Sequence, residues 1–191
     1  MILITPLKDK DIVSLEAGDI VYVSGRICTA RDKAHQRALK EGRFPVDLMG
    51  GVLFHAGPAV RKKNKSWVVA AIGPTTSSRM NGVEPEFIKQ FGVKAIIGKG
   101  GMDEKVAEAM KENKCVYLSM TGGCAATAAS QIKRVEGVEW LDLGVPEAVW
   151  VLEVENFGPL VVGMDSKGNS LYADVKKKVS KNLSGLKQKL K

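Results

Sequence analysis

The stretch GPTTSSRM, residues 73–80, places a run of hydroxyl side chains beside an arginine. Gly73 and Pro74 end the apolar segment before it, and the hydroxyls that follow can accept hydrogen bonds from backbone N–H groups in caps or turns. Thr75 and Arg79 are four positions apart, which on a first helical turn would put both side chains on one face. A hydroxyl, several N–H donors and a guanidinium could together bind a carboxylate or a phosphate. Capping and anion binding both remain open at this point.

A second cationic loop, GKGG, contains Lys99 between Gly98 and the pair Gly100 and Gly101. Glycines allow the backbone to approach a ligand closely, and the lysine supplies a point charge. The spacing differs from the G-x-x-x-x-G-K-[ST] pattern of a P-loop. Two tight turns around a surface lysine account for the same residues equally well.

The third candidate is TARDKAH, residues 29–35. Arg31, Asp32 and His35 are three and four positions apart, so their side chains can share one edge of a helix that Thr29 would cap. Composition alone favours a capped helix with a surface ion pair, which contributes about 0–1 kcal/mol.

Taken together, the three loops supply Arg31, Arg79 and Lys99 with threonine hydroxyls between them. Two arginines and a lysine suit a ligand with two carboxylates, because guanidinium groups bind carboxylates in a bidentate manner. We therefore expect a small dicarboxylic acid as the ligand. The sequence offers no evident acid, metal site or redox cofactor that would transform it.

Length and composition predict one globular domain. The chain has 191 residues, of which 45% are hydrophobic, enough to form an ordinary core. No apolar run is long enough for a membrane span, and Lys8 comes too early for a secretory signal, so we expect a cytoplasmic protein. Cys28, Cys115 and Cys124 are widely spaced and only two histidines accompany them, which predicts neither a disulfide framework nor a metal site within this chain.

The net charge of +8 is concentrated at the C-terminus, where residues 173–191 contain seven lysines and one aspartate. This composition predicts a basic helical tail attached to a domain formed by residues 1–172. A solvated helix is the favoured interpretation, and attachment to an acidic partner or to nucleic acid is the weaker one. Few aromatic residues accompany the lysines, so no platform for stacking bases is predicted.

Strands that alternate with helices should position these loops. Apolar strands, several of them followed by a glycine loop, are predicted within residues 18–27, 50–58, 66–74, 93–101, 115–123 and 138–144. Helices are predicted at residues 30–42, 84–92, 102–114 and 124–137, a polar turn at 61–65 and a hairpin region at 148–172. The pattern indicates an α/β fold with a mixed, partly parallel sheet. In such sheets ligands bind at the loops after the carboxyl ends of the strands, which is where the three cationic loops fall.

TARDKAH, HAGP, GPTTSSRM and GKGG occur in this order, and together they resemble the C-terminal or beta portion of the iron-sulfur hydro-lyases, the class I fumarases and L-tartrate dehydratases. The similarity covers about residues 5–165 and leaves the lysine-rich tail outside. It implies a swivelling β/β/α domain and the beta subunit of a fumarate hydratase, which hydrates fumarate reversibly to L-malate. The alternatives are a dehydratase subunit for L-tartrate or a methylated dicarboxylate such as mesaconate, and an anion- or nucleic-acid-binding module.

The resemblance also implies a role for each cation. Arg31, Arg79 and Lys99 would bind the substrate carboxylates, and Thr75 would exchange a proton with the substrate carbon. A threonine can do so only if neighbouring positive charge and N–H donors stabilise its alkoxide. The residues expected to support these four are Asp32, His35, Gly73, Thr76, Gly98 and Gly100.

In the family that the chain resembles, three cysteines of an alpha subunit hold a [4Fe-4S] cluster. This chain would then be half of an active site, with a cluster-bearing alpha subunit as its partner. Two alpha and two beta chains are the expected assembly, and homodimerisation of the beta chain is plausible. No membrane is expected to take part.

Overall fold

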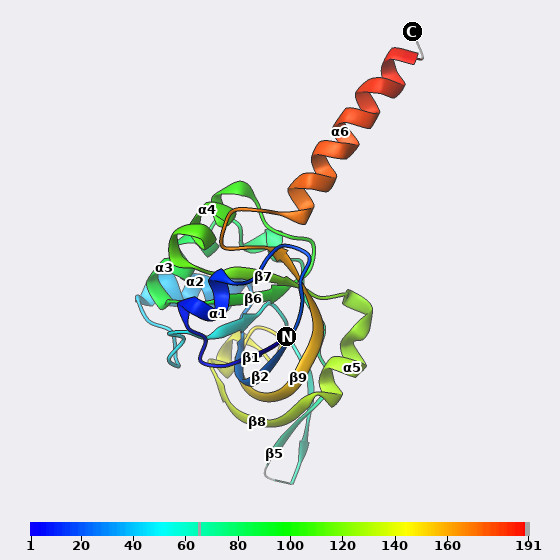
Figure 1. The fold of residues 1–191 in the computed structure, drawn as a ribbon. Helices are drawn as coiled ribbons and strands as arrows, with labels where there is room; N and C mark the ends of the chain where they lie inside the picture. The colour runs from blue at the N-terminus through cyan, green and yellow to red at the C-terminus, as the bar shows by residue number, and fades with distance from the viewer. Residues whose placement is uncertain (65, 190–191) are drawn as a thin grey trace.

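The computed structural model describes residues 1–64 and 66–189, and within them seven strands form one mixed sheet (Figure 1). Its order is β1-β2-β3-β6-β7-β9-β8. Neighbouring strands from β1 to β7 are parallel, whereas β9 runs antiparallel to β2, β7 and β8. The strands are β1 (Ile2–Ile4), β2 (Ile20–Thr29), β3 (Val52–Phe54), β6 (Ala95–Gly98), β7 (Val116–Ser119), β8 (Ile132–Glu139) and β9 (Val149–Met164). The predicted α/β class with a mixed, partly parallel sheet is confirmed.

The sheet closes on itself, because β9 pairs with both β7 and β2. The strands β2, β3, β6, β7 and β9 therefore form a ring around a first hydrophobic core. Fully buried Phe54 and Phe157 meet edge to face inside it, with ring centroids 5.4 Å apart. The ring holds the carboxyl ends of its parallel strands at one edge.

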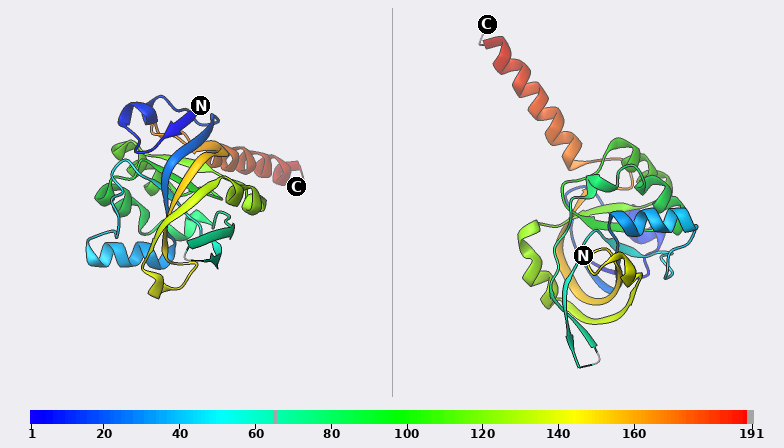
Figure 2. Two further views of the ribbon diagram at one scale, coloured as in Figure 1. Left: turned by 90° about the horizontal axis from the view of Figure 1, so that it is seen from below. Right: turned by 180° about the vertical axis from the view of Figure 1, so that it is seen from behind.

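Helices cover the ring on two sides (Figures 1 and 2). One side carries α2 (Asp32–Glu41), α3 (Glu84–Phe91) and α4 (Glu104–Asn113), which enclose a second hydrophobic core against the sheet. The opposite side carries α5 (Ala125–Ser130) and the hairpin of β4 (Ala59–Lys63) and β5 (Ser66–Ala71). The shorter helices are α1 (Asp9–Val13), η1 (Ser77–Met80), η2 (Gly122–Cys124) and η3 (Leu141–Leu143).

The prediction of a helix at residues 124–137 is wrong beyond Ser130. Helix α5 ends there, and β8 follows at once, paired with β9. Ile132, Val135 and Val138 are the apolar residues of β8 that pack on the first core. β-branched residues favour a half-buried strand over a helix, and this preference outweighs the alanine-rich start of the segment. The strand predicted at 138–144 ends at Glu139 and continues as η3.

The hairpin region predicted at residues 148–172 is wrong at Gly158–Pro159, because β9 is one continuous strand of 16 residues, whereas an antiparallel bridge joins Met164 to Ser170 across DSKGN. A cis Gly158–Pro159 peptide lies within it and does not end it. The sequence DSKGN instead forms the turn after β9, where the Asp165 carboxylate accepts hydrogen bonds from the backbone N–H groups of Lys167 and Asn169. Proline has no backbone N–H, so it fits in a strand at a position where pairing requires no donor.

The apolar segment at residues 66–74 does not enter the main sheet. Its strand β5 pairs only with β4 and is mostly half-exposed rather than buried. Of the residues predicted as a polar turn, 61–65, the first three extend β4, Asn64 is in a turn with a φ of +56°, and residue 65 lies outside the described residues. Trp67 still contacts the body through the edge of Trp150, with ring centroids 5.3 Å apart.

Helix α6 (Leu171–Lys189) projects away from the body (Figure 1). It begins two residues before the predicted boundary at 173, and Tyr172 anchors it through a hydrogen bond between its hydroxyl and Ser119 Oγ, 2.7 Å long. Val175, Val179 and Leu183 are exposed along the helix. Among the described residues, no helix has the length and apolar content that a bilayer crossing requires.

Candidate active site

Three parallel strands end side by side at one edge of the ring, and each is followed by a polar or cationic residue. Arg31 follows β2, His55 follows β3 and Lys99 follows β6. Since β2 pairs with β3 and β3 with β6, these loops are neighbours in space as well. The edge is the one at which α/β sheets bind ligands.

The segment that contains Thr75 inserts between the ends of β3 and β6. The backbone N–H of Thr75 donates to His55 O at 2.7 Å, and that of Ser77 donates to Lys99 O at 3.0 Å. Isolated bridges join Pro74 to Ala56 and Thr76 to Lys99. Residues 74–77 thus act as a short extra strand that fixes the backbone of Thr75 next to that of Lys99.

Glycines allow this close approach. A Cβ on Gly98 would lie 1.9 Å from Ser77 Oγ, so only glycine fits beside the inserted segment. A Cβ on Gly73 would lie 3.3 Å from Ala125 Cβ, where the chain passes the start of α5. Gly100 has a φ of +83°, a conformation that side chains with a Cβ adopt rarely. Gly98 is therefore required by space and Gly100 by its backbone conformation, whereas Gly73 is only tightly packed against α5.

Arg79 lies on η1 and is held by Asp32 at the start of α2. Arg79 Nε donates to Asp32 Oδ1 at 3.0 Å, and its Nη2 lies 2.9 Å from Oδ2. The Arg79 side chain remains half exposed, since 50% of it is accessible. Thr75 precedes η1 instead of sharing a helical turn with Arg79, so the predicted common helix face is wrong.

Arg31 approaches the same edge from the end of β2. Its Nη2 lies 3.4 Å from Glu147 Oε1, and its Nε is buried without a hydrogen-bond partner among the described residues. The predicted cap Thr29 does not cap α2: it is buried, donates to Ala148 O and accepts from the Trp150 backbone N–H. Glu147 is a neighbour of Arg31 that the sequence did not indicate, because 116 positions separate the two residues.

The Lys99 side chain lies over the turn that follows β7. Its Nζ would be 3.4 Å from a Cβ placed on Gly122. It forms no ion pair with any other residue that the structure describes. The ammonium group is therefore available to an anion at this edge.

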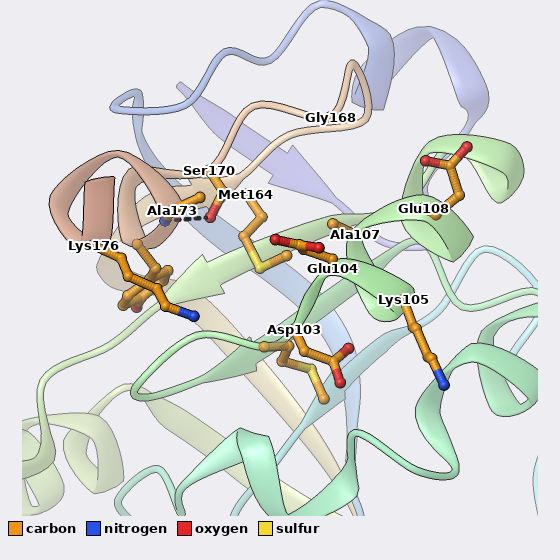
Figure 3. Close-up of a pocket in the computed structure, with 12 residues that line it drawn as sticks. Asp103, Glu104, Lys105, Ala107, Glu108, Met164, Gly168, Ser170, Ala173 and Lys176 are labelled. Carbon is orange, nitrogen blue, oxygen red and sulfur yellow. Dashed lines mark hydrogen bonds between the residues drawn. The ribbon is translucent and has the colours of Figure 1, made fainter. Parts of the chain in front are cut away.

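Thr75, Arg31 and Lys99 are half-buried and Arg79 is exposed, and two surface cavities lie elsewhere on the molecule. A cavity of about 580 Å³ lies between α4 and the start of α6, lined by Met102, Asp103, Glu104, Met164 and Lys176 among others (Figure 3). A second cavity of about 360 Å³ lies beside β2 and the loop that contains Met49. Neither is lined by Thr75, Arg31, Arg79 or Lys99.

The prediction that His35 shares one helix edge with Arg31 and Asp32 at the surface is wrong. It is fully buried, and its Nε2 lies 3.2 Å from Glu84 Oε2. His55 Nε2 lies 3.2 Å from the same oxygen. The sequence indicated no role for Glu84 or His55, because a glutamate in the first turn of a helix is ordinarily exposed.

The buried cluster of His35, Glu84 and His55 shifts the pKa of each member. For Glu84, burial opposes ionisation, but the charges and hydrogen bonds of the two histidines outweigh it and lower its pKa to about 2. For His35, burial lowers the pKa, and the Glu84 carboxylate outweighs it, so the net pKa is raised. For His55, burial prevails and the pKa is lowered. The cluster therefore favours a carboxylate beside one charged and one neutral imidazole.

Raising the pH should remove the stabilising contribution of His35. Because its pKa is raised on folding, this contribution is complete below the unfolded value of 6.5 and is lost as the pH rises through the folded pKa. Glu84 behaves oppositely, since its contribution is complete above 4.5 and is lost as the pH falls toward about 2. We expect the difference in free energy of unfolding between the wild type and His35→Gln to shrink above pH 6.5.

Urea denaturation at a series of pH values measures this difference. Lys40→Gln, at an exposed position on the same helix α2, is the matched control and should give a difference that does not change over that range. A difference for His35→Gln that stays constant up to high pH would contradict a raised pKa.

The cysteines do not fit an iron-sulfur cluster. Cys28 on β2 and Cys115 before β7 are buried in the second core, and burial raises the pKa of the Cys28 thiol to about 12 and that of Cys115 further still. Cluster ligands are thiolates. Cys124 stands in the turn after β7, where its Sγ lies 2.7 Å from Thr121 Oγ1.

The chain is similar to proteins of one known family. Residues 2–175 match the family described as Fumarase C-terminus. The "Putative L(+)-tartrate dehydratase subunit beta" of Methanocaldococcus jannaschii is 51% identical over 94% of this chain and 95% of its own length. The L(+)-tartrate dehydratase subunit beta of Escherichia coli K12 is 45% identical over 92% of this chain and 88% of its own.

A longer relative is the "Putative fumarate hydratase class I" of Geobacillus stearothermophilus. It is 44% identical over 96% of this chain, which covers 35% of that protein. A similar sequence is thus named as a separate subunit in some relatives and occurs as part of a longer chain in another. The match to the family covers nearly the whole body of the fold, from β1 to the first turn of α6. The chain belongs to the Fumarase C-terminus family, as the beta subunit of a hydro-lyase.

Proposed function

We propose that this chain is the beta subunit of a two-subunit class I fumarate hydratase, which interconverts fumarate and L-malate. The observation that carries the proposal is the insertion of residues 74–77 between the ends of β3 and β6, which brings Thr75 beside Lys99. Arg79 and Arg31 reach the same edge of the ring. L-tartrate and mesaconate are the alternative substrates, and two of the relatives above carry the name of tartrate dehydratase subunits.

In this proposal, the three cations bind the two carboxylates of the substrate. The buried Nε of Arg31 has no partner among the described residues, and Lys99 has no ion pair there. Asp32 occupies two nitrogens of Arg79 and so fixes the plane of its guanidinium, while half of the side chain faces solvent. A preorganised donor aimed at developing charge stabilises the transition state by about 3–4 kcal/mol.

Thr75 transfers the proton at the substrate carbon. Removing that proton builds negative charge on the adjacent carboxylate, which the cations stabilise. The Thr75 side chain is half-buried, and its hydroxyl makes no hydrogen bond with the residues that the structure describes. Positive charge beside such a hydroxyl lowers the energy of the alkoxide, which a free threonine cannot form at neutral pH.

The other half of the site would come from an alpha subunit. That subunit would hold the [4Fe-4S] cluster, whose open iron acts as a Lewis acid toward the substrate hydroxyl. The four residues line neither of the two cavities described above, which supports a site that a partner completes. Two copies of each subunit form the proposed assembly.

Mixing the purified chain with its alpha subunit tests the proposal. Neither chain alone should turn over substrate, and the mixture should hydrate fumarate, measured as loss of its ultraviolet absorbance. Parallel assays with L-tartrate and mesaconate compare kcat/KM for the three substrates. Efficient dehydration by the metal-free beta chain alone would refute the shared site. If kcat/KM were higher for L-tartrate than for fumarate, L-tartrate would be the substrate.

A further inference from the structure

A buried network of polar side chains lies beneath the candidate site. At one end, His35 Nδ1 lies 2.8 Å from the backbone carbonyl oxygen of Arg31. In the middle, Glu84 Oε2 lies 3.2 Å from the Nε2 atoms of both His35 and His55. His35, Glu84 and His55 are all fully buried. One end of this polar network therefore contacts the backbone of Arg31, the first of the proposed substrate-binding cations.

The other end of the network reaches two further loops of the site. His55 Nδ1 lies 2.9 Å from the buried Ser77 Oγ. Ser77 Oγ in turn accepts a hydrogen bond of 2.9 Å from the Tyr117 hydroxyl. The backbone of His55 accepts from Thr75, and that of Lys99 accepts from Ser77. One continuous set of contacts thus joins the loops of Arg31, Thr75 and Lys99.

The acceptors and donors along the network fix where its protons are. The Arg31 carbonyl can only accept, so His35 Nδ1 carries a proton, and its Nε2 must carry another to face a carboxylate oxygen. Tyr117 donates to Ser77, so the Ser77 hydroxyl is free to donate to His55 Nδ1. His55 is then neutral and protonated at Nε2, facing Glu84. The cluster contains one positive and one negative charge.

The two Nε2 atoms and both Glu84 oxygens are buried without a hydrogen-bond partner among the described residues, so ion pairing and a bound metal ion are two accounts of the cluster. The Nε2 atoms and a Glu84 oxygen lie within 4.8 Å of one another, a spacing that could also hold a cation. A metal would require both Nε2 atoms to be unprotonated. Proton positions therefore distinguish the two possibilities.

We propose that Glu84, clamped between His35 and His55, is a positioning residue that sets the relative placement of the loops of Arg31, Thr75 and Lys99. The role in turnover rests on the proposed hydro-lyase function. Long arginine and lysine side chains can adjust to a displaced loop, whereas the short Thr75 side chain cannot. Loss of Glu84 should accordingly reduce kcat more than it raises KM. Displacement of a reacting group by about 1 Å can cost on the order of 10²-fold in rate.

The first test reads the protons directly. The chain contains only two histidines, so labelling histidine with ¹⁵N in the full-length protein gives NMR signals from these two rings alone. At neutral pH we expect one doubly protonated ring and one neutral ring protonated at Nε2. Asp32, Cys115 and Tyr117 are the other titratable groups that face the cluster. Two neutral rings protonated at Nδ1, or a stoichiometric metal in elemental analysis, would refute the proposal.

The second test reads the loops without relying on activity. In Glu84→Gln, the amides of Thr75 and Ser77 should exchange with solvent at least tenfold faster than in the wild type. Val154→Ala, which opens a gap in the first core on β9, is the control for general loss of stability. Equal exchange rates at these two amides in the Glu84→Gln and Val154→Ala proteins would count against a positioning role.

Turnover by the complex with the alpha subunit completes the test. We expect kcat to fall on the order of 10²-fold in Glu84→Gln, with KM changed severalfold at most, and Val154→Ala to keep its kcat. Tyr117→Phe removes only the hydroxyl that donates to Ser77. This variant should also lower kcat, by a smaller factor than Glu84→Gln. It provides the test if Glu84→Gln does not fold. Normal kcat in both network variants would exclude the proposed role. An inactive wild-type complex would refute the function, and the exchange test would still decide the positioning.

Discussion

Thr75→Val should lower kcat of the complex with the alpha subunit by about 10²–10⁴-fold, the range over which a positioned proton-transfer group accelerates a reaction. Valine has nearly the shape of threonine, and the backbone N–H of residue 75 still donates to His55 O. Binding through the three cations should therefore persist, with little change in KM. Steady-state kinetics with fumarate and with L-malate measures both directions.

Thr127→Val, at an exposed position on α5, is the matched control and should keep wild-type turnover. Thr75→Ser retains the hydroxyl and should recover a large part of the rate. If Thr75→Val turned over substrate nearly as fast as the wild type, another group would have to carry the proton, and Thr75 would be only a loop residue.

Arg79→Lys should lower kcat/KM by about 10²–10³-fold, as expected when one preorganised donor is lost. Arg79 uses Nε and Nη2 to hold Asp32, so its remaining N–H groups are available to a substrate carboxylate. A lysine has one ammonium group and no planar fork, and it cannot hold Asp32 and a carboxylate in the same geometry. The charge is conserved, so the loss would reflect geometry.

Arg134→Lys provides the control for this substitution. Arg134 lies on β8, is 66% exposed and pairs with Glu136 and Glu153, so its replacement should leave turnover unchanged. An Arg79→Lys enzyme with near-normal kcat/KM would remove Arg79 from the site.

Local backbone requirements near the candidate site could be predicted from the sequence. Gly73, Gly98 and Gly100 mark positions where the structure leaves little room for a side chain or requires a positive φ. Those requirements are local, so they are visible in the residues themselves. The alternation of strands and helices from residue 93 to 119 was equally local and was confirmed.

The features that the sequence did not predict depend on contacts between distant residues. Residues 132–139 follow an alanine-rich helix, and only their pairing with β9 makes them a strand. Glu84 has an ordinary position at the start of a helix, and nothing in its neighbours in sequence indicates that two histidines 49 and 29 positions earlier meet its carboxylate. Likewise, Ser77 was expected to cap or shape a loop, and its burial beneath Gly98 depends on tertiary packing.

The position of β9 in the ring also governs how the chain can fold during synthesis. Ile20 pairs with Val161, and β9 supplies partners for strands from both the beginning and the middle of the chain. Such contacts between distant residues slow folding, since the intervening loop must be ordered first. On the ribosome, the edge of β2 that pairs with β9 stays exposed until nearly the whole body has emerged, and unpaired edges invite aggregation. We therefore expect chains truncated before β9 to fail to fold, and the complete chain to depend on rapid closure of the ring once β9 appears.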